Sequence, residues 1–449
     1  MTASVGTPLT ASAGLSLRRN FMWTLVGNIF YALCQWAIII VLAKLTTPLM
    51  VGQFSLGLAI STPVIMLANL QLKVVQATDV HRAYRFSEYL GLRTVTTTLA
   101  FFVIVAIAGV ISHEPKTMLV VIAVAVAKSI ESMTDVFYGL FQLHDHLDQT
   151  GTSMMIRGAL SVTAMSTALY FTRDVLWGVS AMALAWFTSL LLFDARRGQR
   201  FLATEAQTPG WIERWKLLKP RYTFSRQWTL TRIAFPLGIV MTLASLNMNV
   251  PRYFVQSAMG ETDLGVFSIM AYTMTAISTV VDAMRAAAVP KLARYYVNGK
   301  MDSFRSLLAK MGGMAAALGV LATLGILWLG SQVLLVLYGP DYASYAGVLV
   351  WLTAASGCSA VASLLMGGLD SSKRFRVQVP MFVAVVATNA IGCAILVPRF
   401  GLTGAAIASL IASAVHMAIA FVLVSRVCLT PGGRETMLPA LSDSWGSGL

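Results

Sequence analysis

Residues 402–425, LTGAAIASLIASAVHMAIAFVLVS, contain no acidic residue, no lysine and no arginine. A helix of about 20 such residues is long enough to cross the ~30 Å hydrocarbon core of a bilayer. In lipid the backbone must satisfy its own hydrogen bonds, and a helix does this within a single segment. This stretch therefore predicts a transmembrane helix.

Similar apolar stretches recur along the whole chain, which is 57% hydrophobic and only 12% charged, with a mean hydropathy of +0.72. A soluble domain of this length needs a more strongly charged surface. The sequence thus predicts an all-α integral membrane protein with about twelve transmembrane helices. The predicted spans are Phe21–Ala43, Gly52–Leu72, Tyr89–Ile111, Met118–Leu143, Thr152–Phe171, Val175–Asp194, Ile233–Tyr253, Gly265–Val289, Leu307–Leu329, Gly347–Leu369, Val377–Val397 and Leu402–Ser425.

The lysines and arginines, which give the chain a net charge of +14, gather in alternate segments between these spans. Cytoplasmic loops carry such an excess, so the pattern predicts an inner-membrane protein with both termini in the cytoplasm. Because topology explains the charge, no nucleic-acid partner is expected. The inner segments hold Arg18, Arg19, Lys73, Arg82, Arg85, Arg157, the cluster from Arg196 to Arg232, Lys291, Arg294, Lys300, Arg305, Lys373, Arg374, Arg376, Arg426 and Arg434. The outer segments hold Lys44, Lys116, Arg173, Arg252 and Arg399.

The longest stretch between predicted spans, residues 195–231, mixes basic side chains with Trp211, Trp215 and Trp228. Such a segment is typical of a membrane surface, where basic residues meet anionic lipid head groups. The predicted organisation is a disordered cytoplasmic lead (1–17), an N-terminal six-helix bundle (18–194), this basic aromatic linker (195–231), a C-terminal six-helix bundle (232–426) and a cytoplasmic tail (427–449).

Two pairs of short strings suggest that the two halves repeat one another. VGQFSL at residues 51–56 and LGVFSI at residues 264–269 each open a predicted span, while FYGL at 137–140 and MGGL at 366–369 each close one. Two matched halves predict two pseudo-symmetric six-helix bundles around a central cleft, where secondary transporters bind their substrates. Chance similarity between short glycine-containing strings is the alternative.

Further strings are spread along most of the chain: LANLQL at 67–72 with QATD at 76–79, NVPRYF at 249–254, PKLARY at 290–295, and LYGPDYA at 337–343. In their order and spacing they resemble polysaccharide flippases. These are the O-antigen and exopolysaccharide exporters of the multidrug/oligosaccharidyl-lipid/polysaccharide (MOP) superfamily. The resemblance runs from about Arg18 to Arg426, although each motif by itself is loose.

This resemblance implies a non-enzymatic flippase that carries undecaprenyl-pyrophosphate-linked oligosaccharide units to the periplasmic leaflet by alternating access, without a cofactor. Lipopolysaccharide or exopolysaccharide biosynthesis would use the product, with a polymerase and glycosyltransferases as partners. A cation-coupled multidrug antiporter of the same superfamily is the main alternative. It would favour an acidic cleft, whereas this sequence places Lys128, Arg252 and Arg285 beside its acids. A membrane glycosyltransferase or polymerase is a remote alternative, because the outer loops are short.

Lys128, Glu131 and Asp135 fall within one predicted span at spacings that put all three on one helical face. Ionisable residues at bilayer depth are costly and therefore candidates for function. Their carboxylates could bind a coupling ion in the cleft. Alternatively, Lys128 and Glu131 pair and the three residues hold the bundle together.

Arg252, with Asn247 and Asn249 before it, lies at the poorly charged outer end of another span. A guanidinium can grip a pyrophosphate with two parallel hydrogen bonds and never loses its charge. These residues are thus head-group candidates, although an arginine that reaches toward the membrane surface is the alternative for Arg252.

Other polar residues have plainer interpretations. Asp282 and Arg285 are spaced to pair with one another as a structural clamp. Asn28 and Gln35 could bond sugar hydroxyls of a substrate or tie helices together. The cysteines and histidines show no metal-ligand spacing, so no metal site is expected.

Overall fold

The computed structural model describes residues 17–79, 82–112, 114–206, 210–371 and 377–429. Within these ranges every regular element is a helix, which confirms the all-α prediction. Of the predicted lead and tail, residues 1–16 and 430–449 lie outside the described part, as do Lys373, Arg374 and Arg376.

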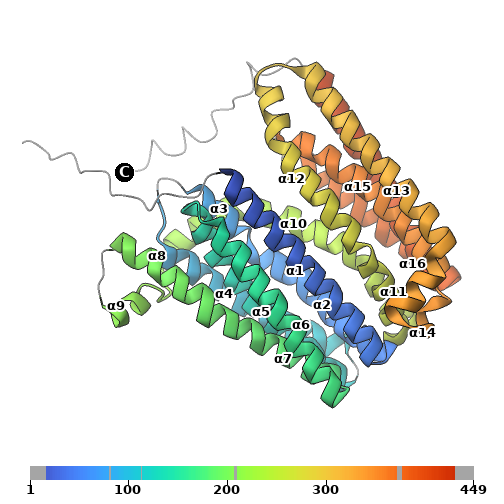
Figure 1. The fold of residues 1–449 in the computed structure, drawn as a ribbon, viewed down its shortest axis with the longest axis horizontal. Coiled ribbons are helices and arrows are strands. Elements are labelled where there is room, and N and C mark those ends of the chain that lie inside the picture. Colours follow the sequence, from blue (N-terminus) through green and yellow to red (C-terminus); the bar gives the residue numbers. More distant parts are fainter. Residues whose placement is uncertain (1–16, 80–81, 113, 207–209, 372–376, 430–449) are drawn as a thin grey trace, which may run out of the picture. The chain divides into compact units, whose positions relative to one another are not determined.

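The chain packs into two units, coloured along the sequence in Figure 1. Unit 1 contains the described residues up to Thr273 together with Leu337–Gly339. Its helices are α1 (Leu17–Leu45), α2 (Pro48–Asn69), α3 (Leu72–Thr78), α4 (Phe86–Ile111), α5 (Pro115–Leu143), α6 (Leu147–Thr172), α7 (Val175–Ser189), the π-helix η1 (Leu190–Ala195), α8 (Arg196–Ala206), α9 (Trp211–Lys216), α10 (Phe224–Met259) and α11 (Glu261–Thr273).

Unit 2 begins at Met274 and contains the rest of the described chain. Its helices are α12 (Thr275–Val297), α13 (Met301–Tyr338, whose last two residues belong to unit 1), α14 (Pro340–Ala343), α15 (Ala346–Ser371) and α16 (Gln378–Leu429). Packing thus divides the chain at Met274, because α10 and α11 pack against α2. The division by repeat at the linker stays a prediction.

Among the described residues, 9 helices are long and apolar enough to cross a membrane. One of them lies within α16, where Gly401 (φ 57°, ψ −134°) separates two helical runs. The prediction placed a boundary between spans at this position. Since α6 is not among the 9 helices, the full count of about twelve spans stays a prediction.

The two strings of the proposed repeat meet where α2 crosses α11. A Cβ atom on Gly52 would overlap the backbone carbonyl of Glu261, and one on Gly265 would overlap the carbonyl of Pro48. Each helix therefore approaches the other through a position where only glycine fits. The sequence strings 51–56 and 264–269 are not only similar but face one another.

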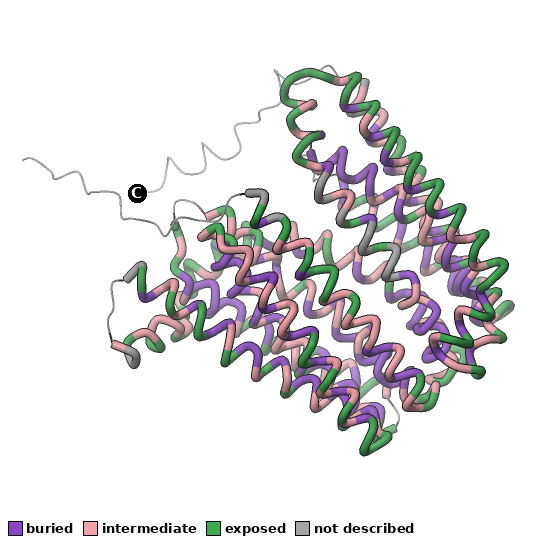
Figure 2. The backbone as a smooth tube through the Cα atoms, in the orientation of Figure 1, coloured by how far each residue is buried: buried purple, intermediate pink, exposed green. Residues whose placement is uncertain are grey.

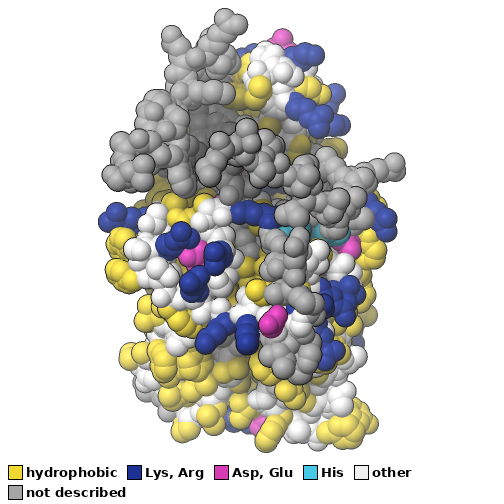
Figure 3. All heavy atoms as spheres, turned by 90° about the vertical axis from the view of Figure 1, so that its left-hand side faces the viewer, with side chains coloured by type: hydrophobic (Ala, Val, Ile, Leu, Met, Phe, Trp, Pro, Cys, Tyr) yellow, Lys and Arg dark blue, Asp and Glu magenta, His cyan; other side chains and the backbone are white. Residues whose placement is uncertain are grey.

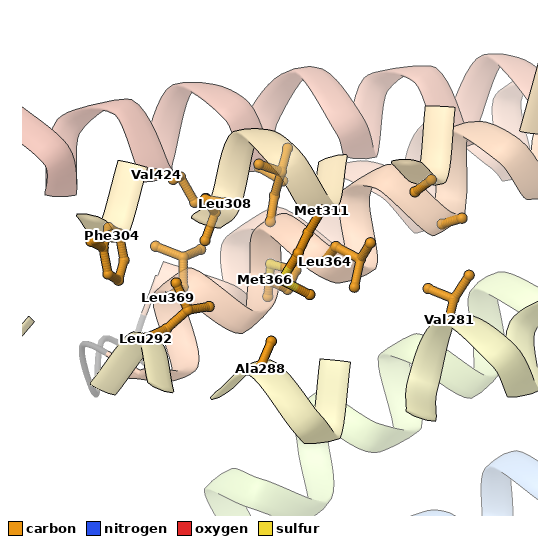
Figure 4. Close-up of a cluster of buried hydrophobic side chains, with 14 of the residues drawn as sticks. Val281, Ala288, Leu292, Phe304, Leu308, Met311, Leu364, Met366, Leu369 and Val424 are labelled. Atoms are coloured by element: carbon orange, nitrogen blue, oxygen red, sulfur yellow. The ribbon is translucent and has the colours of Figure 1, made fainter. Parts of the chain in front are cut away.

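Each unit buries its own apolar core, as Figure 2 shows where helices of the same unit face each other. In unit 1, Tyr89, Phe137, Phe141 and Leu230 belong to this core. In unit 2, side chains from α12, α13, α15 and α16 interdigitate (Figure 4); among them are Leu292, Phe304, Leu308, Met311, Leu364, Leu369 and Val424.

The outer sides of both units are apolar as well. Phe102, Leu184 and Trp328 are 63%, 65% and 84% exposed, respectively. A water-soluble protein rarely leaves so many large apolar side chains uncovered. These surfaces fit hydrocarbon, and the protein is a multi-pass membrane protein.

Candidate functional site

The charged residues of α5 contact two separate clusters. Lys128 donates to Glu131 over 2.7 Å, in agreement with the predicted pair. Asp135 instead lies one turn further along and pairs with Arg93 of α4, with 3.0 Å between Nη2 and Oδ2. The three charges therefore share a helix but not a common set of partners.

Arg93 is the centre of the first cluster and is fully buried. Its guanidinium donates to Asn69 of α2 and to Ser132 of α5, in addition to Asp135. Ser132 donates in turn to Asn69 over 2.6 Å and bonds Thr97 over 3.0 Å. This cluster ties α2, α4 and α5 together.

Sequence reasoning overlooked Arg93, although it lies inside the predicted span Tyr89–Ile111. An arginine in an apolar run needs a buried partner, and Asp135 was the carboxylate available on the next span. That complementarity was the signal in the sequence. With Asp135 held by Arg93, the structural interpretation gains support for this member of the α5 group.

Arg157 of α6 is the centre of the second cluster and is 4% exposed. Its guanidinium lies 4.7 Å from the ring centroid of Tyr31, 5.4 Å from that of Trp186 and 5.8 Å from that of Tyr138. The nearest carboxylate oxygen is that of Glu131, 3.4 Å from Nη2. An arginine held between three rings and an acid is shielded from water by α1, α5, α6 and α7.

Grouping Arg157 with the cytoplasmic loop charges was therefore wrong. The residue lies in the middle of α6, which begins at Leu147 and continues to Thr172. The predicted span Thr152–Phe171 already contained Arg157, and its counter-charge Glu131 lies on another helix, α5. The assignment of the other basic residues to cytoplasmic segments stays a prediction.

The two polar residues predicted on the first span have different surroundings. Gln35 donates to the hydroxyl of Tyr31 over 3.0 Å, and Tyr31 donates to Glu131 over 3.1 Å. Gln35 is thereby joined to the Arg157 cluster. Asn28 is exposed and donates to the carbonyl of Thr24 in its own helix.

Arg252 of α10 is buried, with 7% exposure. It donates to Asn249 over 2.7 Å, and its guanidinium lies 4.9 Å from the ring of Tyr272 on α11. The next residue, Tyr253, donates to the carbonyl of Ala59 on α2. An arginine that reaches toward the membrane surface keeps its guanidinium in water. Because Arg252 is buried, the structure contradicts this alternative for it.

Asn247 is half-buried two residues before Asn249 on the same helix. The structure thus brings Arg252 and Asn249 into direct contact, with Asn247 nearby along α10. Within the described residues, Nε of Arg252 is buried without a hydrogen-bond acceptor. The guanidinium is only partly satisfied by the protein itself.

The predicted clamp in unit 2 has another partner. Arg285 bonds Asp370 of α15, with 3.0 Å between Nη2 and Oδ2, while Asp282 is exposed on α12. Gln378 donates to the second oxygen of Asp370 over 2.9 Å. The ion pair therefore joins α12 to α15.

The linker is anchored to the start of α4. The backbone N–H of Arg221 donates to the carbonyl of Ser87, and Arg226 bonds Glu88 over 3.2 Å. Many basic side chains gather at the end of the molecule that Figure 3 faces. Exposed among the linker residues are Arg196, Arg197, Arg200, Lys216, Lys219 and Arg221.

Within the described part of the chain, no group of three or more His, Cys, Asp or Glu side chains is arranged so that it could hold a metal ion. The four cysteines are free thiols. The candidate site therefore consists of buried arginine side chains, their carboxylate partners and aromatic rings.

A sequence comparison connects these features with known proteins. The pattern of the family described as "Polysaccharide biosynthesis protein" matches residues 17–296. The chain belongs to this family. It is also 23% identical to the capsular polysaccharide biosynthesis protein CapF of Staphylococcus aureus, over 91% of this chain and 99% of CapF.

Solved structures of similar fold are transporters. An inward-facing multidrug resistance MATE family transporter of the MOP superfamily matches with a TM-score of 0.65 and 16% identity, over 91% of this chain and 98% of that one. A mutant of the MATE transporter VcmN of Vibrio cholerae matches with a TM-score of 0.59 and 13% identity, over 91% and 95%. The chain shares its fold with these two transporters.

Proposed function

We propose that this family member is a flippase. It moves undecaprenyl-pyrophosphate-linked oligosaccharide units from the cytoplasmic to the periplasmic leaflet of the inner membrane by alternating access. Lipopolysaccharide or exopolysaccharide synthesis consumes the product. The family supports a role in polysaccharide synthesis, and the fold supports transport rather than catalysis.

The observation that carries the substrate class is the incompletely paired Arg252. Asn249 and the Tyr272 ring hold its guanidinium in place, while Nε is left without an acceptor among the described residues. Phosphate oxygens are well matched to such a fork of N–H donors. We infer that a pyrophosphate head group bonds Arg252 when the site opens, with Asn247, Asn249, Asn28 and Gln35 as candidates for further contacts.

The proposal includes the surroundings of the flippase. Both termini lie in the cytoplasm, and the basic linker contacts anionic lipids. A polymerase and glycosyltransferases are the partners that would consume and supply the lipid-linked glycan.

The test is complementation of a strain that lacks its O-antigen or exopolysaccharide flippase. Arg252→Lys keeps the charge but loses the fork, so we expect at least about a tenfold loss of export, equivalent to ~1.4 kcal/mol. Arg232→Lys, an exposed position on the same helix, is the matched control. Lipid-linked units that stay on the cytoplasmic leaflet despite expression of the wild-type chain would refute the flippase. Unchanged export by Arg252→Lys would remove Arg252 from the head-group site.

The fold also favours a second candidate, a cation-coupled multidrug antiporter, because MATE transporters share it. A strain expressing the chain would then tolerate cationic drugs better than its parent. Drug tolerance without export of polysaccharide would favour this candidate.

A further inference from the structure

Asp194 is a buried acid that the proposed head-group site does not use. It lies on η1, the π-helical turn that links α7 to α8, and its side chain is 0% exposed. Within the described part of the chain, neither carboxylate oxygen accepts a well-aligned hydrogen bond, and the Ser153 hydroxyl is a donor within reach. The hydroxyl of Ser153, which lies beside it, bonds Tyr138 over 2.9 Å. π-Helical turns are rare and often occur at functional sites.

Groups on two neighbouring helices interact electrostatically with Asp194. Tyr138 belongs to α5, and Arg157 belongs to α6. The aromatic ring of Trp186 on α7 packs against Arg157 and carries no charge. From α8, the exposed basic side chains Arg196, Arg197 and Arg200 point to the surface.

Arg157 has hydrogen-bonding capacity to spare. Its Nη2 is 3.4 Å from Glu131, but Nε and Nη1 are buried and lack acceptors among the described residues. The guanidinium is paired with Glu131 and also attracts Asp194 electrostatically, without forming an ion pair with it. Free donors and free acceptors are buried in the same cluster.

An ionised carboxylate that is buried without a donor is very costly, whereas a protonated carboxyl group is neutral. Two arrangements remove that cost. Either Asp194 holds a proton while Arg157 stays with Glu131, or Asp194 is ionised and Arg157 turns to it. Glu131 tolerates both arrangements because Lys128, at 2.7 Å, and Tyr31, at 3.1 Å, bond it independently of Arg157.

We propose that Asp194 binds and releases a proton and that Arg157 changes its partner from Glu131 to Asp194 when the proton leaves. The proton forms an O–H bond with one carboxylate oxygen and returns to water when that bond breaks, without any oxidation or reduction. Glu131, whose side chain is 26% exposed, is the member of the cluster through which we expect the proton to enter and leave. The coupling ion of the proposed flippase is then a proton, and this assignment rests on the proposed function.

Proton binding can be measured without any substrate. Infrared difference spectra of the purified full-length protein in lipid nanodiscs, recorded across a pH titration, should show the carbonyl stretch of a protonated buried carboxyl group. Asp194→Asn, which has nearly the same shape, should lose this band. Asp135→Asn is the matched control and should keep it, because Asp135 is already paired with Arg93. The same band in Asp194→Asn, or no band in the wild type, overturns the proposal.

A second variant tests the change of partner and does not alter Asp194. Glu131→Gln removes one negative charge from the cluster and frees Arg157 to bond Asp194. The ionised form of Asp194 is thereby favoured, so the band should titrate at a pH lower by about one unit. An unchanged or higher midpoint would contradict the exchange of Arg157 between the two acids. If Asp194→Asn does not fold, the titration of Glu131→Gln still tests whether Asp194 carries the proton.

A transport measurement separates this proposal from the proposed function. In vesicles, a pH gradient should accelerate movement of the lipid-linked glycan by the wild type and have no effect on Asp194→Asn. Asp302→Asn, a fully exposed position, serves as the control. If the infrared carboxyl band titrates with pH but the vesicles move no glycan, the proton site is supported and the proposed flippase function is refuted. If glycan moves but Asp194→Asn responds to the gradient as the wild type does, the proton proposal falls.

Discussion

Arg93 illustrates what a single charged residue does inside this membrane protein. Its side chain is fully enclosed, and four polar groups on α2, α4 and α5 surround it: Asn69, Thr97, Ser132 and Asp135. Burying a guanidinium is costly, and only a nearly complete set of partners offsets that cost. The residue thereby dictates how its three helices align.

We expect Arg93→Met to destabilise the protein by about 3 kcal/mol, because Asp135 would lose its cation. Asp135 keeps some contact with solvent, at 28% exposure, which places the loss at the low end for a broken buried pair. Unfolding of the purified protein in mixed micelles measures the change.

The double variant Arg93→Met with Asp135→Leu is the informative control. Removing both charges should restore part of the lost stability, since no unpaired ion remains. A double variant that is less stable than Arg93→Met alone would mean that the pair is not the reason for the effect.

At the scale of helices, the crossing of α2 and α11 depends on two glycines. Gly52 and Gly265 let the backbones approach so closely that a methyl group on either would overlap a carbonyl of the other helix. Small residues at such crossings are how membrane helices pack without a hydrophobic driving force.

Gly52→Ala should therefore cost about 1–3 kcal/mol, since the two helices must separate to admit the methyl group. Gly109→Ala on α4 is the matched control, because nothing lies within 4 Å of the added carbon. There the change should be neutral or stabilising by up to about 1 kcal/mol, since alanine favours a helix. The unfolding assay used for Arg93 ranks the two variants, and equal stabilities would rule out close packing at Gly52.

For the molecule as a whole, orientation in the membrane is the property that loop charges predict. In a chain whose four cysteines are replaced by serine, single cysteines can be placed at Thr204 on α8 and at Thr172 at the end of α6, both exposed. We expect an impermeant thiol reagent added outside to label Thr172→Cys and to leave Thr204→Cys unmodified in intact cells. The reverse pattern would mean that both termini face the periplasm.

Much of the fold was accessible from the sequence because hydropathy and glycine strings act locally. Apolar runs predicted helices that the structure contains. The strings 51–56 and 264–269 were noticed for their similarity, but their contact at the α2–α11 crossing was not predicted. Partners across helices were harder to foresee. Asp135 pairs with Arg93, and Arg285 pairs with Asp370. Such pairs depend on how helices rotate against each other, which spacing along one helix does not determine.

The candidate site shows the same limit. Lys128 and Glu131, three residues apart, form the pair that helical spacing offered as one of two interpretations. Arg157 was placed with the loops because charge counting treats every arginine alike. Asp194, at the end of a predicted span, drew no attention, because its isolation becomes visible only when neighbouring helices are in place.

The contact between Gly52 and Gly265 also bears on the ancestry of the chain. When related positions of two repeats touch each other, the contact is isologous, as in a dimer with twofold symmetry. A half-length ancestor would have presented the same glycine to a second copy of itself. Under the predicted repeat, gene duplication and fusion would have required no new interface, and the shared glycine would mark the surface through which two separate chains first met.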